Sequence, residues 1–384
     1  MTRPRILIVD DDPGMLRATE RVLSGQYEVA SYRSSREALA RAPEFAPDLA
    51  LLDVRMPELS GFELREALQD TCRDVDVIFM TGSLNEIDAT LVRAIRAKAF
   101  FFIQKPFDRE VLLTLVERCL ELRRLSAENR RHVARLEAEL AEARAFQQSL
   151  LRPESGRVGG LSVAVRYLPS AELGGDYYDY AAAGPTEATL LIADAAGHGV
   201  SAAMLTGVVK AAFDASRVDR YEPRAIVRRI AEGLRGFEYQ RFVTATCVRV
   251  ETTRGVLEYV NAGHPAGAAW SAAGLTRLES TGPIICSAFP NADWQQVTID
   301  IAPGTHLLLF TDGISECSAS ARAAADRQTS DEMFGEGRIV EECLRHPAGG
   351  ADLLDAILER VTRFSAARTD DQTLVLASTS VQGS

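Results

Sequence analysis

Short apolar runs alternate with amphipathic stretches over the first third of the chain. The apolar runs are predicted strands, and they comprise Ile6–Val9, Val29–Ser31, Leu49–Leu52, Val77–Met80 and Phe100–Ile103. Stretches with helical periodicity lie between them, for example Gly61–Gln69 and Glu86–Arg96. Five short buried strands that alternate with helices predict a parallel, doubly wound α/β sheet.

Polar residues follow the predicted strands of this sheet. The acidic run Asp10–Asp12 comes directly after the first strand, and Asp53 follows the third. The carboxyl ends of parallel strands share one edge, where polar sites gather. Crowded carboxylates repel one another and favour a hard divalent cation, most simply Mg²⁺. Thr81 and Lys105 follow the last two strands, where they could bind the oxygens of a phosphoryl group.

These residues lie in motifs that resemble a response-regulator receiver domain. The motifs are ILIVDDDP (Ile6–Pro13), DVRMPELSG (Asp53–Gly61), MTG (Met80–Gly82) and KPF (Lys105–Phe107). The resemblance covers roughly residues 3–122, and it implies a flavodoxin-like (βα)5 receiver domain over residues 1–122. A flavodoxin-like fold whose acids merely lie at strand ends is the alternative, but it does not explain Thr81 and Lys105.

The receiver resemblance implies a role for each of its motif residues. A histidine kinase would transfer a phosphoryl group to Asp53, the phosphoacceptor. The Mg²⁺ ligands would be Asp10, acting through water, Asp11, Asp53 and the carbonyl of Arg55. The residues that respond to phosphorylation would be Thr81, Phe102 and Lys105.

A long segment from Arg109 to Leu151 contains neither Pro nor Gly, and its Leu, Glu, Ala and Arg residues favour helix. Two series spaced by seven residues run through it. They are Leu115, Leu122, Asn129, Leu136, Ala143 and Leu150, and, three positions earlier, Leu112, Cys119, Ser126, Val133, Leu140 and Gln147. These a and d series predict a coiled-coil linker helix over residues 109–151, continuous with the last receiver helix, and a homodimer. Ser126 and Asn129 weaken its middle, so a single helix folded onto a neighbouring domain is the alternative.

Strands and helices are mixed in the second half of the chain. The predicted strands are Leu161–Tyr167, Thr189–Asp194, Thr244–Glu251, Val256–Asn261, His306–Thr311 and Gln372–Ala377. The predicted helices are Ser201–Ala215, Pro223–Leu234 and Ala351–Phe364. Acidic motifs next to small residues fall at strand or turn ends: Gly174–Asp176, Asp194–Gly199, Thr311–Gly313 and Asp370–Asp371. Each alone is typical of a turn. Together they could converge on two cations that activate water and clamp a phosphoryl group for in-line attack.

This half resembles the bacterial SpoIIE-type serine phosphatases of the metal-dependent (PPM) phosphatase family. The matching motifs are QQSLLRP (Gln147–Pro153), ELGGDYYDY (Glu172–Tyr180), ADAAGHG (Ala193–Gly199), RFVTAT (Arg241–Thr246), NAGHP (Asn261–Pro265), TDGISE (Thr311–Glu316) and TDDQTLV (Thr369–Val375). The resemblance runs from about Phe146 to Ser378, and it implies an α/β/β/α sandwich over residues 152–380.

The phosphatase resemblance also implies a ligand set for two Mn²⁺ or Mg²⁺ ions. Asp194 would bridge both ions, Asp312 and Asp370 would complete one site, and Asp176 and the Ala195 carbonyl would contribute to the other. Asp371 is either a structural carboxylate or a third, weak metal ligand. His198 is predicted to order its loop rather than to act as an acid, and His264 is predicted to be a turn residue.

Composition, net charge and cysteine spacing exclude or disfavour several classes of protein. The chain has 384 residues, of which 46% are hydrophobic and 25% charged, which excludes wholesale disorder. Its net charge of −11 disfavours binding of nucleic acid through a basic surface. The six cysteines are far apart in the sequence and form no CxxC pair, so the sequence predicts no zinc knuckle. No signal peptide and no membrane span are visible, so we expect no membrane partner and a location in a reducing cytoplasm.

These features predict a response regulator whose output is a protein-serine/threonine phosphatase. By resemblance, the substrate is a phosphoserine on a STAS-domain anti-sigma-factor antagonist, as in partner switching. Phosphorylation of Asp53 would act through the linker on Phe146–Leu151, which resembles the family's regulatory helix. A catalytically inactive, phosphorylation-controlled adaptor is the alternative, but all four metal aspartates are present. A DNA-binding output is disfavoured, because nothing after residue 122 looks like a basic helix-turn-helix.

Overall fold

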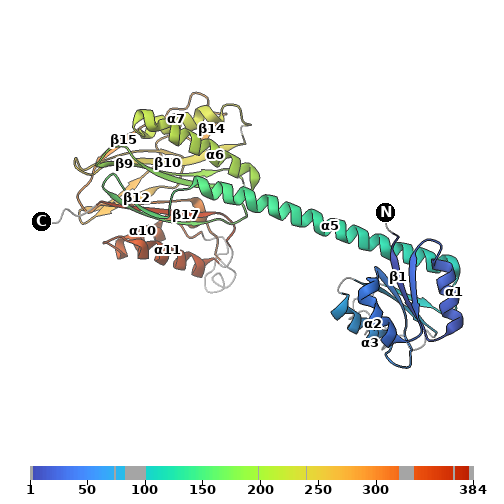
Figure 1. Ribbon diagram of the computed structural model, residues 1–384. Coiled ribbons are helices and arrows are strands. Elements are labelled where there is room, and N and C mark those ends of the chain that lie inside the picture. The colour runs from blue at the N-terminus through green and yellow to red at the C-terminus, as the bar shows by residue number, and fades with distance from the viewer. Residues whose placement is uncertain are drawn as a thin grey trace. The chain divides into compact units, whose positions relative to one another are not determined.

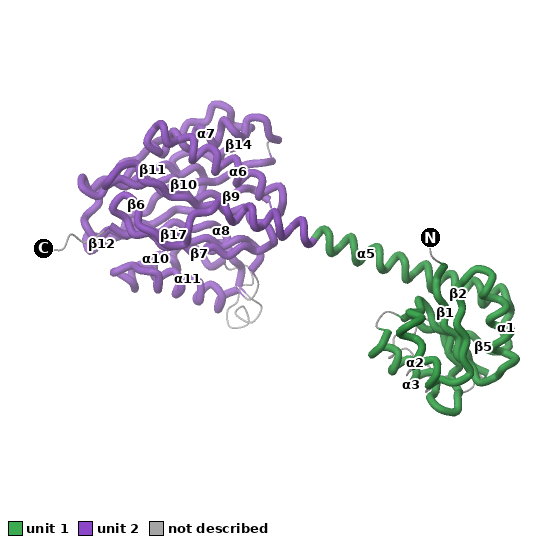
Figure 2. Tube along the Cα trace, in the orientation of Figure 1, with its two compact units in different colours: residues 1–136 green, residues 137–384 purple. Residues whose placement is uncertain are grey.

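The computed structural model divides the chain into two compact units, residues 1–136 and residues 137–384 (Figure 2). It describes residues 3–72, 75–82, 101–197, 199–238, 240–319, 333–365 and 368–379. Among the helices in these ranges, none combines the length and the hydropathy that crossing a bilayer requires.

The first unit is built on a five-stranded parallel sheet with the strand order β2-β1-β3-β4-β5 (Figure 1). The strands are β1 (Arg5–Val9), β2 (Glu28–Tyr32), β3 (Leu49–Asp53), β4 (Asp76–Thr81) and β5 (Phe101–Gln104). The helices are α1 (Pro13–Leu23), α2 (Ser35–Phe45) and α3 (Gly61–Thr71), together with the start of α5 (Arg109–Leu150). The predicted doubly wound sheet is confirmed, whereas the predicted helix Glu86–Arg96 lies outside the described residues.

Both faces of this sheet are covered, which explains why its central strands are continuous apolar runs. Helix α1 and the first turns of α5 pack on one face, and α2 and α3 pack on the other. Capping residues stabilise the first turns of two of these helices. Asp12 caps α1 by accepting the backbone N–H groups of Gly14 and Met15, and Ser60 and Glu63 form a capping box at α3. Asp12 therefore serves as a helix cap beside the acidic edge of the sheet.

Helix α5 is a single helix of 42 residues that begins in the first unit and ends in the second. Its two ends are already packed. Leu112 and Cys119 are buried in the core of the first unit, and Gln147 is buried in the second. Between them, Val133 and Leu136 are exposed. The apolar seam, meaning the a and d residues of the predicted heptad series, is therefore exposed to solvent only in its middle part.

The second unit contains two antiparallel sheets stacked face to face (Figure 1). The first sheet has the order β15-β11-β10-β9-β8, with β14 paired to β10, and the second has the order β13-β12-β16-β17-β7-β6. The strands of the first sheet are β8 (Asp176–Ala182), β9 (Glu187–Ala195), β10 (Phe242–Glu251), β11 (Val256–Ala262), β14 (Ile285–Cys286) and β15 (Val297–Asp300). Those of the second are β6 (Ser155–Val158), β7 (Leu161–Leu168), β12 (Gly267–Ser271), β13 (Gly274–Leu278), β16 (His306–Phe310) and β17 (Gln372–Thr379).

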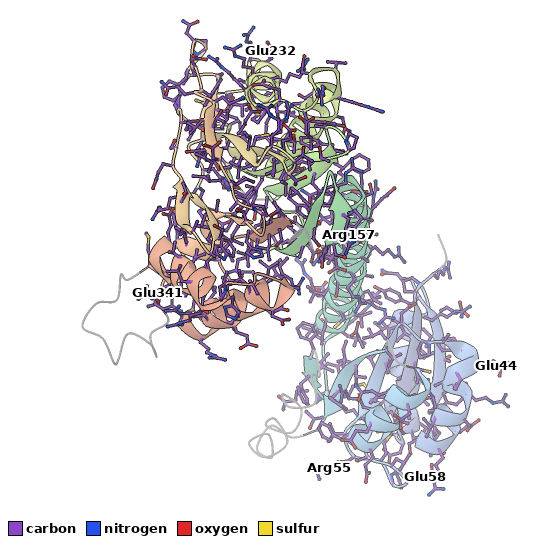
Figure 3. All side chains as sticks on the ribbon, turned by 90° about the vertical axis from the view of Figure 1, so that its left-hand side faces the viewer. Glu44, Arg55, Glu58, Arg157, Glu232 and Glu341 are labelled. Carbon is purple, nitrogen blue, oxygen red and sulfur yellow. The ribbon has the colours of Figure 1, made fainter. Side chains whose placement is uncertain are left out.

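Helices cover both outer faces of this pair of sheets. Helices α6 (Val200–Ala215) and α7 (Pro223–Leu234) pack on the first sheet, and the short helix η1 (Ser216–Asp219) joins them. Helices α10 (Glu336–Arg345) and α11 (Ala351–Phe364) pack on the second, near the one-turn helix α8 (Asp312–Ser315). Glu232 on α7 and Glu341 on α10 mark the two outer layers in Figure 3. The predicted α/β/β/α sandwich is confirmed.

Candidate functional site

Three carboxylates meet at the carboxyl edge of the receiver sheet. Oxygens of Asp10, Asp11 and Asp53 lie within 4.8 Å of one another. Lys105 Nζ lies 2.6 Å from Asp10 Oδ2 and 2.8 Å from Asp53 Oδ1. Burial raises the pKa of Asp53, and the Lys105 ammonium opposes this shift. Because three close carboxylates carry more negative charge than one lysine neutralises, this oxygen-rich site fits Mg²⁺.

The other predicted receiver residues border this edge. Thr81 is the last residue of β4, and Arg55 follows β3 by two positions. Phe102 on β5 stacks on Phe79, with ring centroids 5.4 Å apart. Phe102 is thus partly buried against the face of the sheet that α2 and α3 cover.

A second polar site begins with a row of side chains across the first sheet of the other unit. Strand register pairs Asp176 on β8 with Asp194 on β9, and Asp194 with Thr244 on β10. Directly paired residues point to the same face of a sheet. Two positions along the strands, Tyr178 and Ile192 lie in the core between the two sheets. The row therefore projects from the first sheet toward the second.

The second sheet supplies two hydroxyl groups to this row. Thr311, which follows β16, and Thr373 on β17 both donate to Asp176 Oδ2, at 2.8 and 2.6 Å. The backbone N–H of Thr373 in turn donates to Thr311 Oγ1 at 3.0 Å. Asp176 is only 2% exposed, so these bonds replace the water that a carboxylate needs. They also tie the two sheets together next to Asp312 and Asp370.

Electrostatics show that four aspartates form one cluster. Burial raises the pKa of Asp194 to about 7, and repulsion from Asp312 and Asp370 adds to this shift. Burial and the charge of Asp370 raise the pKa of Asp312 to about 6. Burial first, and then Asp194, raise the pKa of Asp176 well above its ordinary value. A partly buried cluster of repelling carboxylates is complementary to divalent cations, so the donor set fits the Mn²⁺ or Mg²⁺ of metal-dependent phosphatases.

Asp371 holds the loop that leads into β8. Its Oδ1 accepts the backbone N–H of Ser170 at 2.6 Å and the Ser170 hydroxyl at 3.0 Å, and its Oδ2 accepts the N–H of Gly175 at 2.6 Å. Gly175 approaches the next strand so closely that a Cβ there would lie 2.7 Å from the carbonyl oxygen of Ala195. These contacts support the structural interpretation of Asp371 over that of a metal ligand.

The end of helix α5 contacts the same loop. Gln147 is buried, its Nε2 donates to the Gly174 carbonyl at 2.7 Å, and its Oε1 accepts the Gly174 N–H at 3.2 Å. Its Nε2 also lies 3.3 Å from Thr206 Oγ1 on α6. Gly174 is two residues before Asp176. The linker helix is thus hydrogen-bonded to the segment that places a carboxylate of the cluster.

The sequence predicts that His198 orders its loop and that His264 is a turn residue. His198 lies outside the described residues. His264 is buried, and its Nδ1 lies 2.8 Å from the hydroxyl of Thr244, the register partner of Asp194. This contact and the two threonine hydroxyls on Asp176 were not predicted, because they join residues far apart in the sequence.

Comparison with known proteins matches a different family model within each unit. Residues 184–380 match the family model described as Stage II sporulation protein E (SpoIIE), and residues 6–117 match the response regulator receiver domain. The chain is 36% identical over 128 residues to the C4-dicarboxylate transport transcriptional regulatory protein DctD of Pseudomonas aeruginosa, which is 33% of this chain and 27% of DctD. It is 29% identical over 161 residues to the phosphoserine phosphatase RsbP of Bacillus subtilis, which is 40% of each chain. Both relatives are thus matched over less than half of their length.

A solved structure has the same fold as the second unit. The SiaA-PP2C domain of Pseudomonas aeruginosa aligns with a TM-score of 0.54 at 20% sequence identity, over 64% of this chain and 97% of that domain. At this identity the likeness concerns the fold. Since the SpoIIE model spans just over half of the chain, the chain belongs to the SpoIIE family, as a response regulator whose receiver domain is joined by a long helix to a PP2C-type phosphatase domain.

Proposed function

We propose that the second unit is a metal-dependent protein-serine/threonine phosphatase. The observation that carries this proposal is the convergence of four aspartates: Asp176 is buried, Asp194 and Asp312 are partly buried, and Asp370 is exposed. Asp194 repels Asp176, and Asp312 and Asp370 repel Asp194. The proposed ligands of the two ions are Asp194 for both, Asp312 and Asp370 for one, and Asp176 with the Ala195 carbonyl for the other. When bound, two such ions lower the pKa of water and neutralise the oxygens of a phosphoryl group.

The residues around the cluster keep it in a binding-competent form. The Thr311 and Thr373 hydroxyls hydrogen-bond the charged form of Asp176 and so lower its pKa against the effect of burial. Asp371 fixes the loop before Asp176 through backbone N–H groups. A carboxylate that is already oriented binds a cation without the cost of ordering it first.

We propose phosphoserine in a protein as the substrate, specifically on a STAS-domain antagonist of an anti-sigma factor. The similarity to RsbP, a phosphoserine phosphatase, supports the substrate class over the segment that the two chains share. Release of the phosphate would let such an antagonist capture its anti-sigma kinase, as in partner switching.

We propose that the receiver domain controls the phosphatase activity. We also propose that the protein acts in the cytoplasm. A histidine kinase would phosphorylate Asp53, with Mg²⁺ held by Asp10 through water, by Asp11, by Asp53 and by the Arg55 carbonyl. The residues that would respond are Thr81, Phe102 and Lys105. Helix α5 offers the route, because it starts in the receiver and ends with Gln147 bonded to Gly174.

We further propose that the open part of the α5 seam forms a coiled coil with a second copy of the chain. Val133 and Leu136 occupy an a and a d position, and both are exposed. Apolar side chains at these spacings are typical of a helix that pairs with another helix. Asn129, at the preceding d position, is polar and would weaken this part of the seam.

Hydrolysis of a phosphoserine peptide by the purified full chain tests the phosphatase. We expect hydrolysis that requires Mn²⁺ or Mg²⁺ and that falls by roughly a hundredfold or more in Asp194→Ala, because the ions would lose the ligand they share. Asp352→Ala, an exposed aspartate on α11, is the matched control and should retain activity. Absence of hydrolysis in a chain that binds the metal would instead favour the inactive adaptor.

A further inference from the structure

A groove with a volume of about 470 Å³ lies between α7 and the segment that follows β14. This volume falls within the usual range of binding pockets. One wall consists of side chains on α7 and at its C-cap: Arg228, Ala231, Glu232 (labelled in Figure 3) and Arg235. The other wall comes from residues 286–294, which include Phe289 and Trp294. Neither wall contributes a residue to the aspartate cluster.

The loop that forms the second wall is fastened to its surroundings. Asp293 Oδ2 accepts from Arg224 Nη2 at 2.7 Å, and Asp293 Oδ1 accepts from Arg228 Nη2 at 3.3 Å. Trp294 is 3% exposed, and its Nε1 donates to the Pro283 carbonyl at 2.7 Å. The loop is thus bonded both to α7 and to itself, so a ligand in the groove would not have to order it first.

The lining combines apolar surface with one available cation. Phe289 is 48% exposed, although it is a large hydrophobic side chain. Arg228 is paired with Asp293, whereas Arg235 is exposed and forms no ion pair within the described part of the chain. An exposed aromatic ring and an unpaired guanidinium are complementary to a segment that carries apolar side chains and carboxylates.

The groove begins two strands away from the proposed metal ligands. Ile285 of β14 pairs with Val243 of β10, and Val243 pairs with Ala195 of β9. Adjacent strands lie about 4.8 Å apart, so Ile285 lies about 10 Å from Ala195, which directly follows Asp194. An extended chain covers about 3.4 Å per residue. The groove is therefore within reach of residues roughly three to five positions from a phosphoserine at the cluster.

We propose that the groove between α7 and residues 286–294 is a docking site for the substrate protein, and that it takes an acidic segment with apolar residues close to the phosphoserine. This inference rests on the proposed function, because docking there matters only if the aspartate cluster hydrolyses phosphoserine. Arg235 would pair with a carboxylate of the segment, and Phe289 would contact an apolar side chain. Exposed charges of this kind chiefly determine which partner is selected.

Hydrolysis of two phosphoserine peptides by the full chain with Mn²⁺ tests this inference. One peptide carries leucine and glutamates three to five positions away on both sides of the phosphoserine, and the other carries lysines in place of the glutamates. The readout is the ratio of the two kcat/KM values, because a general loss of activity lowers both alike. The variants are Arg235→Glu and Arg235→Lys. Arg217→Glu is the matched control, because Arg217 on η1 is also exposed and forms no ion pair in the described ranges.

The expected preference opposes the overall charge of the protein. A net charge of −11 favours the basic peptide in general, so a preference for the acidic one reports a local cation. We expect the wild-type chain to prefer the acidic peptide by about fivefold, as an exposed ion pair would give. We expect Arg235→Glu to reverse this preference, and Arg235→Lys and Arg217→Glu to keep it.

The remaining outcomes separate the docking site from the phosphatase itself. The same peptide ratio in Arg235→Glu and Arg217→Glu would overturn the inference alone, as would a wild-type preference for the basic peptide. Hydrolysis of para-nitrophenyl phosphate but of neither peptide would also overturn it and leave the phosphatase standing. A chain that hydrolyses none of the three compounds with Mn²⁺ would overturn the proposed function, and the inference with it.

Discussion

Asp176 and Asp194 are direct partners in the antiparallel register of β8 and β9, so a buried and a partly buried carboxylate lie side by side on one face of a sheet. Each raises the cost of ionising the other, and burial strengthens their repulsion. Two threonine hydroxyls from the opposite sheet offset part of this cost at Asp176. A divalent cation would offset the rest, which is why this pair is the best structural evidence for a metal-dependent site.

The first prediction concerns the hydroxyl that lies closest to Asp176. Thr373→Val removes a 2.6 Å hydrogen bond to a buried carboxylate, a bond worth about 1.5–3 kcal/mol. We expect metal-dependent hydrolysis to fall by roughly 10–100-fold, which corresponds to that energy, and Thr373→Ser to restore it. Thr379→Val is the control on the same strand, because the Thr379 hydroxyl bonds only the Thr305 carbonyl in the described structure. Equal rates in all three variants would contradict the role of Thr373.

The second prediction is a pH dependence of stability without metal. The pKa of Asp194 is raised to about 7 and that of Asp312 to about 6, both above the ordinary value of 3.8. The folded state therefore binds more protons than the unfolded state, and stability falls as pH rises between about 4 and 7. We expect the melting temperature of the metal-free chain to fall from pH 5 to pH 8, and added Mn²⁺ to raise it more at pH 8. Asp194→Asn should flatten both effects, whereas an unchanged pH slope in that variant would exclude this cause.

The third prediction concerns the contact between the linker helix and the loop before Asp176. Gln147→Ala removes both hydrogen bonds to Gly174, so we expect altered basal hydrolysis and a weaker response to receiver activation. The neighbouring exposed residue supplies a matched control, Gln148→Ala. Hydrolysis rates with and without a receiver phosphodonor measure both effects. If Gln147→Ala and Gln148→Ala respond alike, the coupling does not pass through this contact.

The fourth prediction concerns the exposed middle of α5. Leu136→Glu places a charge in the proposed seam, and we expect it to shift the chain from dimer to monomer in analytical ultracentrifugation. Ala134→Glu adds the same charge at an exposed position outside the a and d series, so it should leave the dimer intact. A wild-type chain that sediments as a monomer at all concentrations would refute the coiled-coil dimer.

Much of the fold could be predicted from the sequence because its signals are local. Helix Pro223–Leu234 begins at a proline and has one apolar face, so the pattern predicts both of its ends. Strand β8 was missed as a strand, since the segment from Asp176 to Tyr180 is buried on both faces and does not alternate. The short strand Gly267–Ser271 was missed because its glycine and alanines favour no strand.

The residues of the site also fall into two groups, those that the sequence predicts and those that it does not. Asp194 and Asp312 could be proposed from their motifs, because each lies at a strand end beside small residues. The partners that orient the site could not, since Thr373 meets Asp176 from a different sheet, and His264 meets Thr244 through a loop. Such contacts depend on how two sheets stack, which no local pattern encodes.

The central claim is that phosphorylation of Asp53 controls a metal-dependent phosphatase. The most direct test is the rate of Mn²⁺-dependent phosphoserine hydrolysis by the full chain, with and without beryllofluoride as a mimic of aspartyl phosphate. We predict that beryllofluoride changes the rate by between about fivefold and a hundredfold, as a coupling of about 1–3 kcal/mol would give. We also predict that Asp53→Asn removes this change and Asp312→Ala abolishes hydrolysis. Metal-dependent hydrolysis at the same rate with and without beryllofluoride would contradict the claim.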